Sequence, residues 1–237
     1  MVGGSVFGLN YEKNYEYPSL GLSIGDVEKV RALQAHWIWQ KSSPQWAQSA
    51  NVTFTQGINA LGAGTNRYNN LNLAMLGNEA KLDFSRLSFD YALRWRFKNM
   101  MGAGFGIGGQ ASPHVLPVPE RVSFGGTRYG RGYRRGEAAG DQGLGISLEV
   151  NRMFTVKDGN WIKSWEPYFM YEHATSWFKS DAFLGQKLQF STLGVRLSDS
   201  KRYSLDLSVS KPHGDKSFYN PEQKLRYGLT LTYQLDM

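Results

Sequence analysis

The 237-residue sequence contains no cysteine, which excludes disulfide bonds, thiolate metal sites and catalysis by a thiol. It also lacks any run of about 18 consecutive apolar residues, and this excludes a membrane-spanning helix. Its four histidines are dispersed along the chain, without the close spacing of metal ligands. We therefore expect no metal and no other cofactor.

Positive charge is in excess but is not concentrated. Lys and Arg number 27 against 20 Asp and Glu, which gives a formal net charge of +7. No Lys/Arg-rich tract and no basic helical pattern is present, so we expect no nucleic-acid partner. The composition also shows no shift typical of a linker, and we expect residues 1–237 to form a single domain.

What the sequence has instead is a hydrophobic period of two, the pattern of a two-faced β-strand. In residues 86–97 the apolar set is Leu87, Phe89, Tyr91, Leu93, Trp95 and Phe97, and the other set is Arg86, Ser88, Asp90, Ala92, Arg94 and Arg96. The same alternation is clear in residues 101–108, 144–151, 203–210 and 225–235, and weaker in residues 5–13, 20–24, 30–39, 47–58, 166–178 and 188–197. We predict about eleven strands.

Strand length and the position of the charges favour an antiparallel transmembrane β-barrel over a soluble β-sandwich or a lipocalin-like barrel. The clearest segments run to about ten residues, as a tilted strand crossing a bilayer requires. The apolar set would face lipid, and the charged set would line a wet lumen; it comprises Arg86, Asp90, Arg94, Arg96, Glu149 and Asp206. Tryptophans fall near predicted strand ends, as interfacial girdles do, at Trp37, Trp39, Trp46, Trp95, Trp165 and Trp177.

The connections are also asymmetric. Short turns at 98–99 and 199–202 contrast with long connections at 62–81, 111–142 and 212–224, which is the pattern of outer-membrane barrels.

Two short motifs, one typical of a catalytic serine and one of a dinucleotide site, occur in segments that are predicted to be strands. Residues 21–25 match Gly-x-Ser-x-Gly around Ser23, and residues 104–109 match Gly-x-Gly-x-x-Gly. The first motif needs a strand-to-helix turn and the second needs a following helix, but both segments read as strands. Alternate glycines in the second segment would instead leave space in the lumen for an inserted element.

A long basic loop separates the two clearest groups of strands. The run 124–133 combines Arg128 and Arg131 with closely spaced glycines, and Asp141 follows just before the next strand. The glycines allow close backbone approach and positive φ, and an arginine so placed presents a rigid fork of donors to a carboxylate. The residues that we assign to this functional loop are Gly125, Gly126, Gly130, Arg131, Gly132, Tyr133 and Asp141.

The run from Leu116 to Val150 closely resembles the two-partner secretion transporters, the haemolysin-activator pores in the superfamily of the barrel-assembly insertase. Residues 51–62 are similar to a second stretch of that family. The resemblance implies a barrel of about sixteen strands in a Gram-negative outer membrane, of which this chain is the C-terminal part with 11–12 strands visible. It also implies that the long loop folds into the lumen and that Arg131 pairs with an acid on the inner wall, for which Glu172 is the candidate.

The resemblance implies a function without hydrolysis: a pore that exports one large partner exoprotein, such as an adhesin, haemolysin or toxin. The other expected partners are outer-membrane lipid and lipopolysaccharide. Three alternatives remain, namely a passive porin, a barrel insertase and a barrel-embedded phospholipase. The phospholipase would depend on Ser23 and His36.

Overall fold

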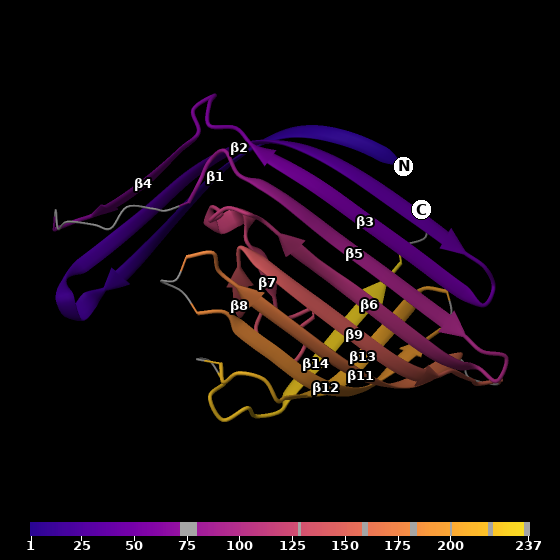
Figure 1. Cartoon of the computed structure of the whole chain (residues 1–237). Helices are drawn as coiled ribbons and strands as arrows, with labels where there is room; N and C mark the ends of the chain where they lie inside the picture. The colour runs from indigo at the N-terminus through magenta and orange to yellow at the C-terminus, as the bar shows by residue number, and fades with distance from the viewer. Residues whose placement is uncertain are drawn as a thin grey trace.

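The computed structural model describes residues 1–71, 80–127, 129–157, 161–180, 184–199, 201–217 and 220–234. Arg128 of the glycine–arginine loop and Leu235 of the last predicted strand lie outside these ranges. The described chain consists mainly of antiparallel β-strands, with one large sheet of twelve strands and a small sheet of two. Figure 1 shows the large sheet as a row of long neighbouring ribbons.

Ten strands follow one another along the large sheet, and two short strands lie off this path. The order is β1 (Val2–Tyr17), β2 (Leu22–Ser42), β3 (Trp46–Gly57), β5 (Ser85–Arg96), β6 (Met101–Ala111), β9 (Gln142–Arg152), β11 (Ser164–Trp177), β12 (Gln186–Ser198), β13 (Tyr203–Pro212) and β14 (Arg226–Tyr233). The short strands are β4 (Gly64–Asn69), paired with β2, and β10 (Phe154–Thr155), paired with β11.

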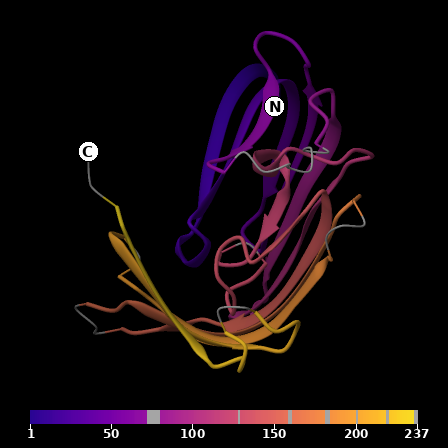
Figure 2. The same cartoon turned by 90° about the vertical axis from the view of Figure 1, so that its left-hand side faces the viewer.

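The remaining elements are short. The described residues contain two 3-10 helices, η1 (Pro18–Leu20) and η2 (Val118–Glu120), and the small sheet is the pair β7 (Val122–Phe124) and β8 (Ala138–Gly140). In Figure 2 the large sheet curves strongly, and the long connection that contains β7 and β8 lies on its concave side. Among the described residues no pairing joins β1 to β14, so the sheet is open between these two strands.

Strand β2 is longer than the sequence predicted. The segments 20–24 and 30–39 were expected to be separate, but β2 is continuous through both. Residues 24–29 pair with β1 on one side and with β4 on the other, so both edges of the segment are hydrogen-bonded. Gly25 interrupts the alternation because the ring of Tyr68 from β4 occupies the place of its side chain. The sequence contained no clear signal for β4.

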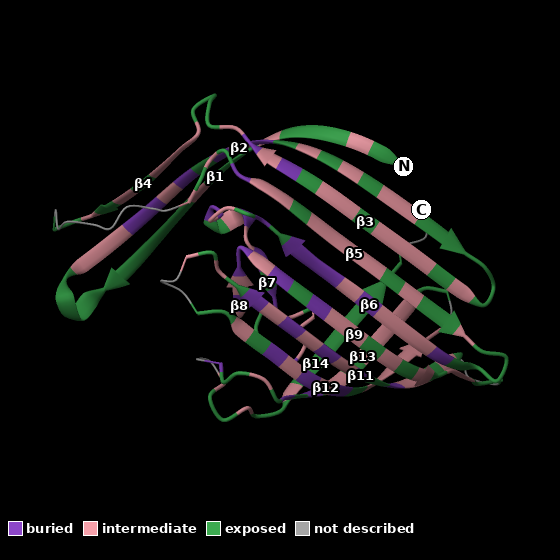
Figure 3. Cartoon of the chain, viewed as in Figure 1, coloured by how far each residue is buried: buried purple, intermediate pink, exposed green. Residues whose placement is uncertain are grey.

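The convex face of the sheet carries the apolar set that the alternation predicts. Leu193 is 65% exposed and Leu229 is 72% exposed, and the same face includes Leu87, Trp95, Leu148, Val150, Phe169, Leu207 and Leu231. Side chains of the opposite set, such as Glu172 at 4% exposure and Met170 at 8%, are covered on the concave side. Figure 3 shows this alternation as bands along β9, β11 and β12. An apolar convex face is the face that meets lipid.

The two ends of the sheet differ in the lengths of their connections. At one end the links 43–45, 97–100 and 199–202 are short, whereas at the other end the links 58–84, 112–141 and 213–225 are long; the links 18–21 and 153–163 depart from this division. Trp46 and Trp177 are terminal residues of β3 and β11, and Trp95 and Trp165 lie next to strand ends. Most of the links and these tryptophans agree with the predicted transmembrane β-barrel. No helix of the described chain is long and apolar enough to cross a membrane.

Candidate functional site

The glycine–arginine loop folds into a compact hairpin that starts from β7 and returns through β8. Gly125 and Gly126 have φ of 112° and 68°, a region that favours glycine. The amide of Gly126 donates to the carbonyls of Gly130, at 2.8 Å, and of Tyr133, at 3.2 Å. A Cβ at Gly130 would collide with the backbone of Gly125, so the tip of the hairpin closes only with glycine at these positions.

A hydrophobic cluster fixes the hairpin to the inner wall of the barrel. The loop contributes Val122, Phe124, Tyr133 and Ala138, and the wall contributes Ala174, Leu188 and Phe190. The Tyr133 and Phe190 rings meet edge to face with centroids 6.3 Å apart, and Gly132 lies against Phe190. Burying one such aromatic side chain stabilises the docked loop by about 1.5–3 kcal/mol. The loop therefore lies in the lumen, as predicted, and its side chains are packed against the inner wall.

Glycines of the wall make room for the ring of Tyr129 at the tip of the loop. A Cβ at Gly145 would lie 2.5 Å from Tyr129 Cγ, and a Cβ at Gly108 would lie 2.9 Å from its hydroxyl oxygen. Tyr129 also contacts Phe124 edge to face, with centroids 6.1 Å apart. The expectation that the glycines of β6 leave space for an inserted element is confirmed, and β9 contributes the tightest contact.

Arg131 binds to the wall at a different carboxylate from the one that was predicted. Its Nη1 donates to the hydroxyl of Tyr168 on β11 at 2.9 Å and lies 3.4 Å from Oδ2 of Asp206 on β13. The Tyr168 hydroxyl in turn donates to Asp206 Oδ1 at 2.8 Å. Glu172 lies buried on the same inner face, but within the described residues it forms no ion pair with Arg131, and its Oε2 has no hydrogen-bond partner.

The predicted ion pair between Arg131 and Glu172 is not among the contacts of the described residues, and the position of Tyr168 explains why Arg131 meets Asp206 instead. Its ring lies across Gly194 of β12, where a Cβ would clash with it, and so reaches β13. The hydroxyl thereby links Arg131 to Asp206 across an intervening strand. The sequence predicted that Asp206 faces the lumen, but no pattern within a single strand could show that a side chain of β11 reaches β13. The glycine at 194 was the available hint.

A network of charged side chains extends from this contact toward the short-turn end of the wall. Arg196 binds both carboxylate oxygens of Glu149, at 2.7 and 2.6 Å, and also Glu166 at 2.9 Å. Arg96 approaches Glu166 to 2.6 Å, and the Arg196 guanidinium lies 4.1 Å from the centre of the Tyr168 ring. These side chains come from β5, β9, β11 and β12, and together they hold the inner wall in one polar surface.

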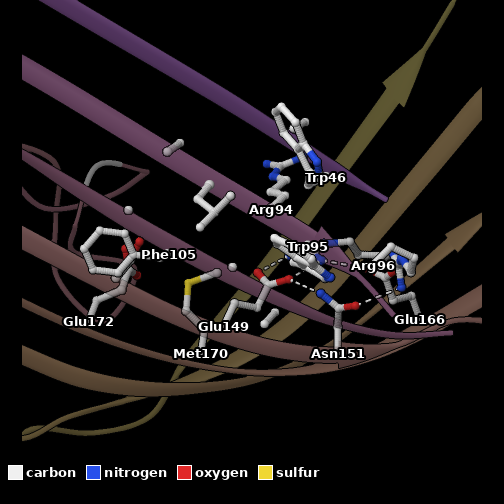
Figure 4. A pocket seen from close by; sticks show the side chains of 18 of the residues that line it. Trp46, Arg94, Trp95, Arg96, Phe105, Glu149, Asn151, Glu166, Met170 and Glu172 are labelled. Carbon is white, nitrogen blue, oxygen red and sulfur yellow. Dashed lines mark hydrogen bonds and ion pairs between the residues drawn. The ribbon is translucent and has the colours of Figure 1, made fainter. Parts of the chain in front are cut away.

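A cavity of about 590 Å³ lies between the network and the loop (Figure 4). Arg94, Met170 and Glu172 line it, and Arg131 borders it from the loop. Its walls mix charged and apolar groups, and the described residues contain no group of acids and histidines able to hold a metal ion. The geometry is that of a partly filled lumen, in which a loop restricts the space.

Two acids at the base of the loop bind it to neighbouring elements. Asp141 is fully buried; it accepts hydrogen bonds from the amides of Leu116 and Lys179, both at 2.8 Å, and lies 3.6 Å from Arg121. The sequence assigned Asp141 to the functional loop, and the structure places it at the point where the loop joins the wall.

Glu120 lies 2.9 Å from Arg86 of β5. Burial raises the pKa of Glu120 above its ordinary value, and the nearby Arg86 opposes this. Burial also raises the pKa of the Tyr133 hydroxyl. The loop is therefore anchored by the contacts of two carboxylates at its base and by hydrophobic packing nearer its tip.

The serine motif does not form a catalytic site. Ser23 lies within β2, not on a strand-to-helix turn, and His36 lies thirteen residues further along the same strand. At about 3.3 Å per residue the two are separated by roughly 40 Å. Residues 104–109 likewise lie inside strand β6, without the helix that a dinucleotide site needs.

An apolar convex face, a charged concave face and a loop packed inside define the wall of a transmembrane β-barrel. The sequence profile of the haemolysin secretion/activation protein family ShlB/FhaC/HecB matches residues 27–167, more than half of the chain. The chain belongs to this family, and it is an outer-membrane β-barrel protein of Gram-negative bacteria. The predicted family, fold class and location are confirmed.

Individual relatives are longer than this chain. The heme/hemopexin transporter protein HuxB of Haemophilus influenzae is 30% identical over 114 residues, which are 45% of this chain and 20% of HuxB. CdiB from Escherichia coli matches 97% of this chain and 44% of its own length, with a TM-score of 0.62 and 14% identity. CdiB from Acinetobacter baumannii matches 97% of this chain and 46% of its own length, with a TM-score of 0.50 and 16% identity. The matched part of the chain thus covers from a fifth to just under half of the length of these relatives.

Proposed function

We propose that the protein is part of an outer-membrane pore through which a partner exoprotein crosses unfolded to the cell surface, without hydrolysis. The family assignment supports a role in secretion. The observation that carries the proposal is the loop in the lumen, held by a buried aromatic cluster and by Arg131 on Tyr168 and Asp206. A loop in this place restricts the lumen, so its position would decide when a chain can pass.

The attachment of the loop is strong enough to hold it and weak enough to be released. A buried ion pair broken on one side costs about 3–5 kcal/mol, but Arg131 and Asp206 keep about a third and a fifth of their side-chain surface exposed, and solvent screening lowers this cost. We expect about 1–2 kcal/mol for the pair. The convex face would meet outer-membrane lipid and lipopolysaccharide throughout.

The experiment compares the surface and secreted proteins of a natural host strain, a strain deleted for this gene, and deletion strains that express single variants. Mass spectrometry identifies the exoprotein as the protein that the deletion removes. Arg131→Ala and Asp206→Ala should shift the loop about 5- to 30-fold from its docked toward its released position, and so change the export of the exoprotein, while the barrel still assembles. Arg135→Ala is the matched control, because this exposed arginine belongs to the same loop.

Three outcomes would contradict the proposal. Loss of small-solute uptake with an unchanged set of secreted proteins would indicate a porin. A general decline of other outer-membrane barrels would indicate an insertase. Normal export by Arg131→Ala would refute the role of the loop contact, and export lost in Glu172→Gln but retained in Asp206→Ala would return the partner role to Glu172.

A further inference from the structure

The convex face changes from apolar to polar along β11, β12 and β13. One row across these strands is formed by Phe169, Leu193 and Val209. The rows that follow toward the long-loop end hold polar side chains, and we define the outer polar patch as Tyr171, His173, Lys187, Gln189, Lys211 and His213. His213 belongs to the patch because its amide donates to the carbonyl of Gln189 at 2.6 Å.

The patch side chains point away from the lumen. The residues that alternate with them in the chain, Ala174, Leu188 and Phe190, are buried against the loop in the hydrophobic cluster. Since successive side chains of a strand point to opposite faces, the patch lies on the convex, lipid-facing side. Lys187 and Lys211 are exposed there.

The polar character does not continue onto the two strands that follow β11 on its other side, β9 and β6. The row of His173 continues through Ile146 on β9 and Ile107 on β6, and the row of Lys187 continues through Leu144 on β9. The neighbouring strands therefore remain apolar at positions where β11, β12 and β13 carry donors. The patch therefore has apolar surface beside it on β9, and apolar surface between it and the short-turn end of the strands. Such a polar patch lies at the level where lipid tails give way to headgroups.

Hydrogen bonds organise the patch and leave its charge positive. Gln189 donates to the hydroxyl of Tyr171, and His173 Nε2 lies 3.1 Å from the hydroxyl oxygen of Thr175. The nearby carboxylate of Asp215 accepts the backbone amide of Lys187 at 2.7 Å. Lys211 Nζ donates to the Gln223 carbonyl at 2.9 Å, a contact that leaves its charge uncompensated.

We infer that the outer polar patch binds the phosphate groups of lipid A in the outer leaflet. Long connections of such barrels lie outside the cell, so this end of the wall meets the outer leaflet, whose lipid carries phosphate. Two lysine ammonium groups beside amide and hydroxyl donors match a phosphate flanked by acyl chains, and the apolar row of Phe169, Leu193 and Val209 would contact those chains. One lysine close to an anionic membrane surface adds about a fivefold gain in binding.

The test uses the full-length protein purified from outer membranes, stripped of lipid and titrated with bisphosphorylated lipid A in detergent, with occupancy read by native mass spectrometry. Lys187→Ala with Lys211→Ala should weaken binding about 25-fold. The matched control is Lys98→Ala with Lys201→Ala, which removes the same charge at the short-turn end. Heat-modifiable migration on gels verifies that both barrels are folded.

Equal lipid A binding by the patch variant and the control variant would overturn the inference. Binding that is unchanged when both phosphates are removed from lipid A would do so as well, and so would equal displacement by phosphatidylglycerol, which would show a general attraction of anionic lipid. Secretion of the exoprotein is a separate measurement, so failure of the lipid site would leave the proposed pore function untouched.

Discussion

A single methyl group on the inner wall should displace the loop, and position 145 is the most informative place to add it, by the substitution Gly145→Ala. The new Cβ would lie 2.5 Å from Tyr129 Cγ, whereas ordinary van der Waals contact begins at 3.4 Å. The ring must therefore move by about 1 Å, away from wall strands that are hydrogen-bonded on both sides. Because the strand accepts alanine, the strain acts on the loop.

The size of the effect follows from overpacking. Inserting one group into a packed site costs about 1–3 kcal/mol, which shifts a docked–released equilibrium about 5- to 150-fold toward release. We expect the full-length protein with Gly145→Ala to show more frequent large conductance steps in planar bilayers, and faster cleavage of the loop by added protease. Urea midpoints of barrel unfolding should change little.

Gly104→Ala is the matched control, because it adds the same methyl group to the inner wall where the nearest neighbour is Glu149 Cβ at 3.3 Å and Tyr129 is not in contact. In a Tyr129→Gly background, Gly145→Ala should have little further effect, since the ring that the new methyl group would meet is absent and glycine suits the positive φ of 46° at that position. Identical conductance and cleavage for Gly145→Ala and Gly104→Ala would refute the reasoning.

Three further changes test the base of the loop and the lipid face. Asp141→Ala leaves two backbone amides without their acceptor and removes the carboxylate beside Arg121, and it should lower the free energy of unfolding by about 2–5 kcal/mol, measured by urea titration in lipid vesicles. Leu193→Arg places a charge on the exposed convex face and should cost about 2–4 kcal/mol in the same titration. Because burial raises the pKa of Glu120, the folded state binds that proton more tightly than the unfolded state does; the free energy of unfolding should fall as pH rises above about 4.5, and Glu120→Gln should remove this slope.

Each of these has a result that would count against it. Asp141→Asn, which keeps an acceptor oxygen, should cost less than Asp141→Ala, and equal losses would mean that the amides are not the cause. A neutral Leu193→Arg would mean that this face does not meet lipid. The same pH slope in wild type and Glu120→Gln would assign the titration to another group.

Local alternation of side chains was sufficient to predict the wall. The two faces of residues 86–97, 144–151 and 203–210 follow from a period of two, and the structure places their apolar sets outward and their charged sets inward. The glycines of β6 likewise predicted an inserted element, because a strand loses stability with every glycine unless something packs against it. The resemblance to a family added the position of the loop in the lumen and the pairing of its arginine with an acid on the inner wall.

The strand β4 and the continuity of β2 were outside the reach of local patterns. Gly25 breaks the alternation, and only its contact with Tyr68 explains why a glycine stands in a long strand. Such a contact joins residues more than forty positions apart, and no short window of sequence contains both.

The sequence by itself determined the class of fold, the two faces of the wall and the identity of the loop, because each depends on the order of side chains within about ten residues. Tertiary structure alone decided which acid Arg131 meets. Glu172 and Asp206 both face the lumen, and the choice depends on the Tyr168 ring crossing Gly194 to place its hydroxyl between Arg131 and Asp206. That geometry arises from the register of three neighbouring strands, which pairing in the folded sheet sets and local sequence does not.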